Sequence, residues 1–179
     1  MSDAPARPSF TGLLVHYDPI FNFSYFVPDG WYRQPIASPE GTGVIYLPDP
    51  ADPFTGFSSE GRDLGIPVEP GDLPTLRAGF LSGLRRLPGA IIEDREAEAI
   101  GDLITMEARH TYRDGKIRRK RWVRLLYRGS TQVRLVAQGA TVEQFHYWLP
   151  MFFESMRTFR FGDWAHDAGV IRSEGRGGG

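Results

Sequence analysis

Apolar and polar residues alternate along much of the chain with a period of two, or form short apolar runs bounded by turn residues. Both patterns are typical of β-strands that bury one or both faces. Tight turns at Asp114-Gly115 and Gly129-Ser130 join three long strands into an antiparallel meander. The predicted strands are residues 21–25, 43–47, 55–64, 90–93, 104–112, 117–127 and 133–137, with a short terminal strand that ends at 161.

Two segments instead show apolar residues at the helical spacing of three and four. The first covers about 72–87, with Asp72 as the expected N-cap and Pro74 in the first turn. Its apolar positions are Leu76, Phe80, Leu84 and Leu87. The second covers about 141–157, and Thr141 with Gln144 predicts a capping box at its start. Its apolar stripe is Phe145, Trp148, Leu149, Phe152, Phe153 and Met156, with Pro150 inside it as the expected site of a kink.

The composition indicates one folded domain in a reducing compartment. The 179 residues are 41% hydrophobic and 13% aromatic, which is enough to bury a core. We expect a flexible segment at 1–9, a domain at 10–161 and a tail at 162–179 that is mobile from about 172. The absence of cysteine excludes disulfides and thiolate chemistry. Since we find no export signal and no apolar run long enough to span a bilayer, we expect a cytoplasmic protein.

The order of short motifs resembles that of the PsbP-like superfamily. An aromatic strand leads into P-D-G-W, then come F-T-G-F, a helix, the charged meander, and a terminal helix that closes on M-R-T-F-R-F. The residues that carry most of the resemblance are Pro28, Gly30, Trp31, Thr158, Phe159 and Phe161. It implies an α+β fold, a single-domain α/β/α sandwich with a largely antiparallel central sheet flanked by helices. The superfamily includes photosystem PsbP proteins, Ran-binding Mog proteins, and bacterial DcrB and Eag-chaperone relatives, so it also implies binding, assembly or chaperone work.

A search of the sequence for chemistry gives no catalytic residue, no metal ligand set and no cofactor motif. His16, His110, His146 and His166 have no metal-ligand spacing, and we expect His110 to be a hydrogen-bonded core or rim residue. No serine lies in a nucleophile elbow, and no glycine-rich loop has the residues of a phosphate cradle. The acidic run from Glu93 to Asp102 is predicted to be a solvated connection.

The strongest surface feature is a basic ribbon at residues 113–134. It contains nine Lys or Arg and one Asp, a local charge of +8 within a chain of net charge −1. Charge on both strand faces predicts an exposed, projecting edge. One interpretation is protection against sheet-to-sheet aggregation, and the other is a partner-binding site. The candidate partner-binding residues are Lys116, Arg118, Arg119, Lys120, Arg121 and Trp122.

These observations favour a non-catalytic protein-binding accessory, assembly or chaperone-like factor. Its expected partner is another protein with an acidic segment, because the overall pI of about 6.4 and the few interleaved aromatic residues argue against nucleic acid. Two alternatives stay open. The ribbon could bind an anionic surface or nucleic acid, or the chain could be an enzyme whose pocket is scattered in the sequence.

Overall fold

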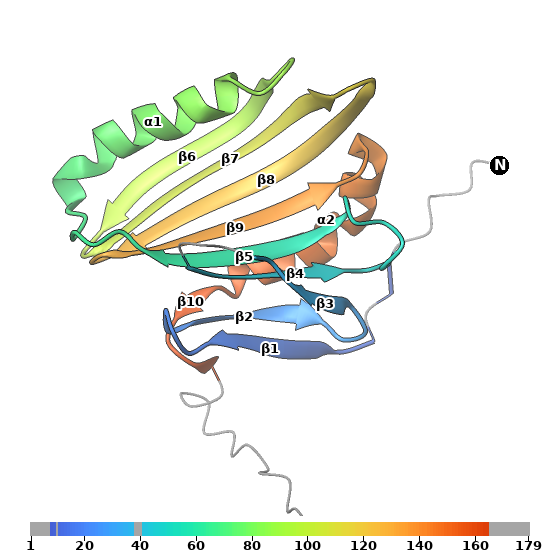
Figure 1. The fold of residues 1–179 in the computed structure, drawn as a ribbon, viewed down its shortest axis with the longest axis horizontal. Coiled ribbons are helices and arrows are strands. Elements are labelled where there is room, and N and C mark those ends of the chain that lie inside the picture. The colour runs from blue at the N-terminus through green and yellow to red at the C-terminus, as the bar shows by residue number, and fades with distance from the viewer. Residues whose placement is uncertain (1–7, 10, 38–40, 165–179) are drawn as a thin grey trace, which may run out of the picture.

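The computed structural model describes residues 8–9, 11–37 and 41–164, and within them the chain forms two antiparallel sheets and two helices (Figure 1). The large sheet has seven strands in the order β3-β4-β5-β9-β8-β7-β6, and the small sheet has three in the order β1-β2-β10. The α+β architecture predicted from the sequence is therefore confirmed. The predicted tail from about 172 and residues 1–7 of the predicted flexible segment lie outside the described residues.

The large sheet is built mostly from hairpins between consecutive strands. Its strands are β3 (Tyr32–Pro35), β4 (Gly41–Leu47), β5 (Gly56–Asp63), β6 (Ile91–Ile100), β7 (Leu103–Asp114), β8 (Ile117–Arg128) and β9 (Thr131–Gly139). Gly115 and Gly129 have positive φ angles, which their turns require, so both predicted meander turns are confirmed. One pairing is not local in sequence, because β5 lies antiparallel to β9 and joins the N-terminal strands to the meander.

The small sheet and one helix cover one face of the large sheet. The small sheet contains β1 (Leu13–Asp18), β2 (Phe23–Pro28) and β10 (Arg160–Phe161). Helix α2 (Val142–Arg157) contacts β9, β8 and β2. Their shared core is aromatic, with Tyr25, Phe57, Phe145 and Phe152 at 0–1% exposure. This face corresponds to the aromatic stripe predicted for the last helix, although Phe153 departs from the prediction because it is 41% exposed.

Helix α1 (Leu73–Arg85) lies on the opposite face, over β6 and β7 (Figure 1). Its partly buried Leu76 and Phe80 pack against Ile104 and Met106 of β7. Asp72 is the N-cap residue of α1, as predicted, but its side chain makes no capping hydrogen bond to the helix. Its carboxylate accepts a hydrogen bond from the backbone of Glu69 (2.9 Å) and closes the short 3₁₀ turn Pro70–Asp72 that precedes the helix. By contrast, the Thr141 half of the capping box predicted for α2 is confirmed, because the Thr141 hydroxyl accepts from the Gln144 backbone N–H at 3.2 Å.

Strands β1 and β3 are absent from the sequence prediction, and the strand predicted at 90–93 covers only the beginning of β6. The acidic run is not a solvated connection, because residues 91–100 form β6, the last strand of the large sheet. Most of its side chains are exposed, so it lacks the alternation that marks a half-buried strand. Strand β1 was missed for a similar reason, since Leu13, Leu14 and Val15 are consecutive apolar residues and all are exposed. Within the described residues, neither helix has the length and apolar content needed to cross a bilayer.

Candidate functional site: a basic groove on the sheet

The basic ribbon does not form a projecting edge. Its central strand, β8, pairs with β7 on one side and β9 on the other, so both the projecting-edge prediction and the edge-protection interpretation are wrong. Arg119, Lys120 and Trp122 are only 4%, 8% and 4% exposed, while Lys116 is exposed in the turn before β8. The sequence signal failed because a run of cations looks the same on an edge strand and on a central strand whose cations have internal partners.

Strand alternation sends half of the ribbon toward the face that carries α2. There, the Lys120 ammonium lies 2.6 Å from the Glu93 carboxylate, which neutralises its buried charge. Glu93 lies at a bulge in β6 between Ile92 and Asp94. Arg118 donates to the Thr111 hydroxyl at 2.9 Å. Trp122 is covered by the Arg109 guanidinium, 4.2 Å from the ring centre. These predicted site residues thus have partners within the chain.

Arg119 and Arg121 point to the other face, on the side that α1 leaves open. Arg119 donates to Asp114 at 2.8 Å and to the Ala140 carbonyl at 3.0 Å. Arg121 differs because its hydrogen-bond acceptors are neutral. It donates to the Gln138 side-chain oxygen at 2.6 Å and to the Tyr112 hydroxyl at 2.8 Å. Burial lowers the pKa of Arg121, and the nearby positive charges of Arg134 and Arg119 lower it further. An anion placed beside Arg121 would relieve this electrostatic cost.

Two adjoining cavities occupy this open half of the sheet, with volumes of about 330 Å³ and 220 Å³. They share Glu60 and Arg134, and we call them together the basic groove. The first lies between α1 and the sheet and is lined by Glu60, Gly61, Arg62, Phe80, Val123, Leu125, Gln132 and Arg134. The second continues along β5, β9 and β8 and is lined by Ile45, Phe54, Gly56, Ser58, Glu60, Arg121, Arg134, Val136 and Gln138.

The register of the strands places cations on both sides of an apolar centre. At one end of the groove, Arg62 of β5 lies opposite Gln132 of β9, and Glu60 lies opposite Arg134. At the other end, Arg121 of β8 lies opposite Gln138 of β9. Val136 lies between them, opposite Val123 of β8. Three arginines and one glutamate line the groove, so the lining has a net charge of +2. The single carboxylate is engaged, because Glu60 accepts a hydrogen bond from Arg134 at 2.6 Å.

Of the charged residues of the groove, the sequence pattern indicated Arg121 as a candidate and Arg134 only as part of the basic ribbon, and it indicated neither Arg62 nor Glu60. Arg62 and Glu60 lie on β5, and Glu60 is 74 residues from Arg134 in the sequence. No local pattern connects these positions, because only the long-range pairing of β5 with β9 brings them together. The sequence does contain one signal that these strand faces are exposed to solvent. Polar residues recur at alternate positions, with Glu60 and Arg62 on β5 and Arg134 and Gln138 on β9.

The histidines are separate from this groove lining. His110 is fully buried on β7, and both of its ring nitrogens lack a hydrogen-bond partner, contrary to the hydrogen-bonded role expected from the sequence. Burial lowers its pKa to about 4, with a further contribution from Arg121. His16 accepts or donates a hydrogen bond at 2.8 Å with the Tyr46 hydroxyl. In the described part of the chain, no three His, Asp or Glu side chains gather into a set that could hold a metal ion.

The chain has the PsbP/Mog1-like fold, as the sequence resemblance predicted. Cyanobacterial PsbP (CyanoP) from Synechocystis sp. PCC 6803 matches with a TM-score of 0.58 and 13% identity, covering 88% of this chain and 98% of that chain. LpqN, a protein involved in cell envelope biogenesis of Mycobacterium tuberculosis, matches with a TM-score of 0.57 and 17% identity over 85% and 90% of the two chains. The Saccharomyces cerevisiae Ran-binding protein Mog1p gives a TM-score of 0.51 and 11% identity over 90% and 99%.

At these identities the likeness concerns the fold, and none of the partners of those proteins transfers to this chain. No protein-family model and no curated protein matches the sequence.

Proposed function

We propose that this chain is a non-catalytic protein-binding factor, of an accessory, assembly or chaperone-like kind, that holds an acidic segment of a partner in the basic groove. The observation that carries the proposal is the uncovered half of the sheet, where Arg62, Arg121 and Arg134 surround an apolar strip. A protein segment with carboxylates on both sides of an apolar side chain would match this order of charge and apolar surface.

The composition of the groove supports binding over catalysis. Its polar groups are guanidiniums, side-chain amides, the Ser58 hydroxyl and one carboxylate that is already paired with Arg134. These groups recognise carboxylates through charge-assisted hydrogen bonds. We place the protein in the cytoplasm, and the absence of cysteine agrees with that compartment. The binding of this fold by a partner protein also has a precedent in Mog1p, which is described as Ran-binding.

Only some of the basic-ribbon residues lie at the groove. Arg121 lines the groove and Arg119 stands beside it, with its guanidinium 4.0 Å from the ring centre of Phe54. Lys116, Arg118, Lys120 and Trp122 lie elsewhere, and their role in partner binding stays a prediction. Reversing the charge of Lys120 would place a second carboxylate beside Glu93 and destabilise the fold, so Lys120 is unsuitable for a binding test.

The test uses a twelve-residue peptide that alternates Asp or Glu with Leu or Phe. We expect its addition to shift the amide resonances of residues 58–62, 121–125 and 132–138 in a ¹⁵N-labelled sample. Arg134→Gln should slow association several-fold at low salt, because a charge at the rim of a site mainly steers the encounter. Lys116→Gln is the matched control, since it makes the same change of charge outside the groove. Glu60→Gln should strengthen binding by removing the internal competitor for Arg134.

The proposal is wrong if the peptide shifts no resonance of the groove, or if Arg134→Gln and Lys116→Gln have equal effects. A random DNA duplex measured in parallel examines the nucleic-acid alternative. Binding to DNA that falls steeply with added salt, with no binding of the peptide, would favour that alternative, because neutralised phosphates release counterions.

A further inference from the structure

The four strands at the edges of the two sheets differ in how they resist pairing with another chain. β6 carries Glu93, Asp94, Glu96 and Glu98 and has a bulge, two features that discourage edge pairing. β3 has four residues and ends in Pro35, and β10 has only two residues. β1 has six residues, pairs with β2 in an unbroken register and has no other strand neighbour. It is the edge without protection among the described strands.

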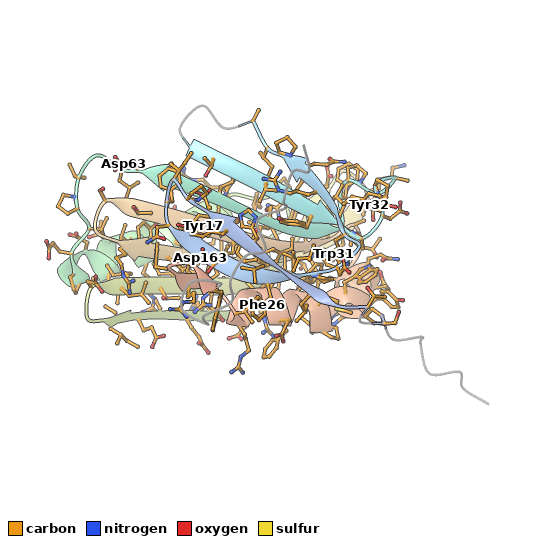
Figure 2. The ribbon with its side chains drawn as sticks, turned by 90° about the horizontal axis from the view of Figure 1, so that it is seen from below. Tyr17, Phe26, Trp31, Tyr32, Asp63 and Asp163 are labelled. Carbon is orange, nitrogen blue, oxygen red and sulfur yellow. The ribbon has the colours of Figure 1, made fainter. Side chains whose placement is uncertain are left out.

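The exposed residues of β1 are apolar. Leu13, Leu14 and Val15 are 41%, 53% and 41% exposed. The small sheet lies toward the viewer in Figure 2, where Tyr17 and Phe26 are labelled. Val15 lies opposite Phe26 in the register, and the Phe26 ring is 5.5 Å from that of Trp164. An exposed strand edge therefore adjoins an apolar outer face, a combination typical of a surface that another strand covers.

Symmetry limits how two copies of β1 could pair. Opposite residues of an antiparallel pair point to the same face of the sheet. A two-fold axis perpendicular to the sheet must therefore pass midway between one residue and the same residue of the second copy, which lie opposite each other. If the axis lay at His16, the Asp18 carboxylate of one copy would lie opposite Leu14 of the other. If the axis lay at Leu14, Gly12 would have to pair with His16, although Gly12 precedes the strand. Centring on Val15 uses Leu13 to Tyr17 of both copies.

The register centred on Val15 matches apolar groups with apolar groups. On the outer face, Leu13 of each copy lies opposite Tyr17 of the other, and the two Val15 side chains meet at the axis. Such aliphatic and aromatic cross-strand pairs stabilise antiparallel sheets. On the inner face, Leu14 lies opposite His16. Burial lowers the pKa of His16 to about 4, so the ring is neutral at pH 7 and the paired segment has no charge.

We propose that β1 pairs with β1 of a second copy, in the antiparallel register centred on Val15, and joins the two small sheets into one sheet of six strands. The absence of charge between Leu13 and Tyr17 favours a second copy over a charged partner segment, because self-pairing opposes no like charges. The net charge of −1 adds little repulsion between whole chains. This surface is separate from the basic groove, which lies on the opposite face of the large sheet.

The chain has no cysteine, so a single introduced thiol tests the register directly. In the proposed dimer the two Cα atoms of residue 15 are within disulfide range, because opposite residues of antiparallel strands lie about 4.5–5.5 Å apart. Under mild oxidation Val15→Cys should yield about fivefold or more disulfide-linked dimer than Leu14→Cys. Random collisions predict the opposite order, since Leu14 is the more exposed of the two. Equal cross-linking, or more by Leu14→Cys, would overturn the register.

Sedimentation equilibrium of the cysteine-free chain tests the dimer itself. We expect a concentration-dependent dimer for the wild type and a dimer dissociation constant about tenfold higher or more for Val15→Lys, because a lysine on each copy meets at the axis. Ile100→Lys on β6 is the control and should leave association unchanged. Circular dichroism verifies that both variants stay folded. A wild type that is monomeric at every concentration would overturn the proposal, as would unchanged association of a folded Val15→Lys variant.

Discussion

The face of the large sheet that carries α1 is divided into a covered half and an open half. In the covered half, strand alternation presents Ile104 and Met106, which are 0–1% exposed beneath the helix. In the open half, the same alternation on the neighbouring strands presents Arg62, Glu60 and Arg134. The backbone geometry is the same in both halves, so the difference comes from what lies above the sheet. No helix covers the polar side chains in the open half, so a ligand or partner can reach them there.

The largest expected effect on stability lies in the core beneath α2. Two adjacent residues of that helix, one buried and one exposed, test it. Phe152→Ala should lower the free energy of unfolding by about 3–5 kcal/mol, because it leaves a cavity at a residue that is 0% exposed. Phe153→Ala is the control, and its effect should stay below about 1 kcal/mol because that ring is 41% exposed. Urea titration of both variants measures the difference. Equal losses would show that α2 does not pack in the orientation described.

The next effect lies at the border between the two halves, where His110 on β7 is opposite Arg121 on β8. An unfolded histidine takes up a proton near pH 6.5, whereas the folded pKa of His110 is about 4. Between these values the unfolded state binds more protons, so stability should fall as the pH is lowered from about 6.5 to about 4. The full loss from His110 should be about 3 kcal/mol.

Thermal unfolding between pH 7 and pH 4 measures this dependence, with His110→Leu as the comparison. His16 has a similarly lowered pKa and should keep part of the acid sensitivity in that variant. A wild type and a His110→Leu variant with identical pH profiles would contradict the assignment to His110.

The smallest expected effect on stability is at the start of α2, the helix on the other face of the large sheet. Thr141→Ala should destabilise the protein by about 1 kcal/mol, because the Gln144 backbone N–H loses the acceptor that it has at 3.2 Å. Thr141→Ser keeps a hydroxyl and should recover most of the loss. Denaturant midpoints of the two variants give the comparison, and equal midpoints would mean that the cap contributes nothing measurable.

The elements that the sequence predicts well are those whose two sides differ. The meander strands β7 to β9 alternate apolar with polar residues, and both helices pack one side against a core and expose the other, so a period is visible. β6 and the exposed part of β1 lack this contrast, since Glu93 to Glu98 and Leu13 to Val15 show long polar or apolar runs. Periodicity detects burial, and it cannot find a strand that is exposed on both sides.

The candidate site was less predictable than the fold. The cations of β8 were visible as a run, but which of them reach solvent depends on partners such as Glu93 on β6 and Gln138 on β9. The position of Arg62 in the same groove depends on the pairing of β5 with β9. These are tertiary contacts, and a single sequence contains no spacing rule that links them.

The pairing of β5 with β9 also has a consequence for the order of folding. Strands β6 to β9 and helix α2 are consecutive in the sequence and close short loops, which form quickly. The β5–β9 ladder must close a loop that spans α1 and three strands, with a larger loss of chain entropy. Since the basic groove contains residues from both sides of this ladder, its charge pattern is complete only when this long-range pairing has formed. A partner that recognises the groove would therefore bind only chains in which β5 and β9 have paired.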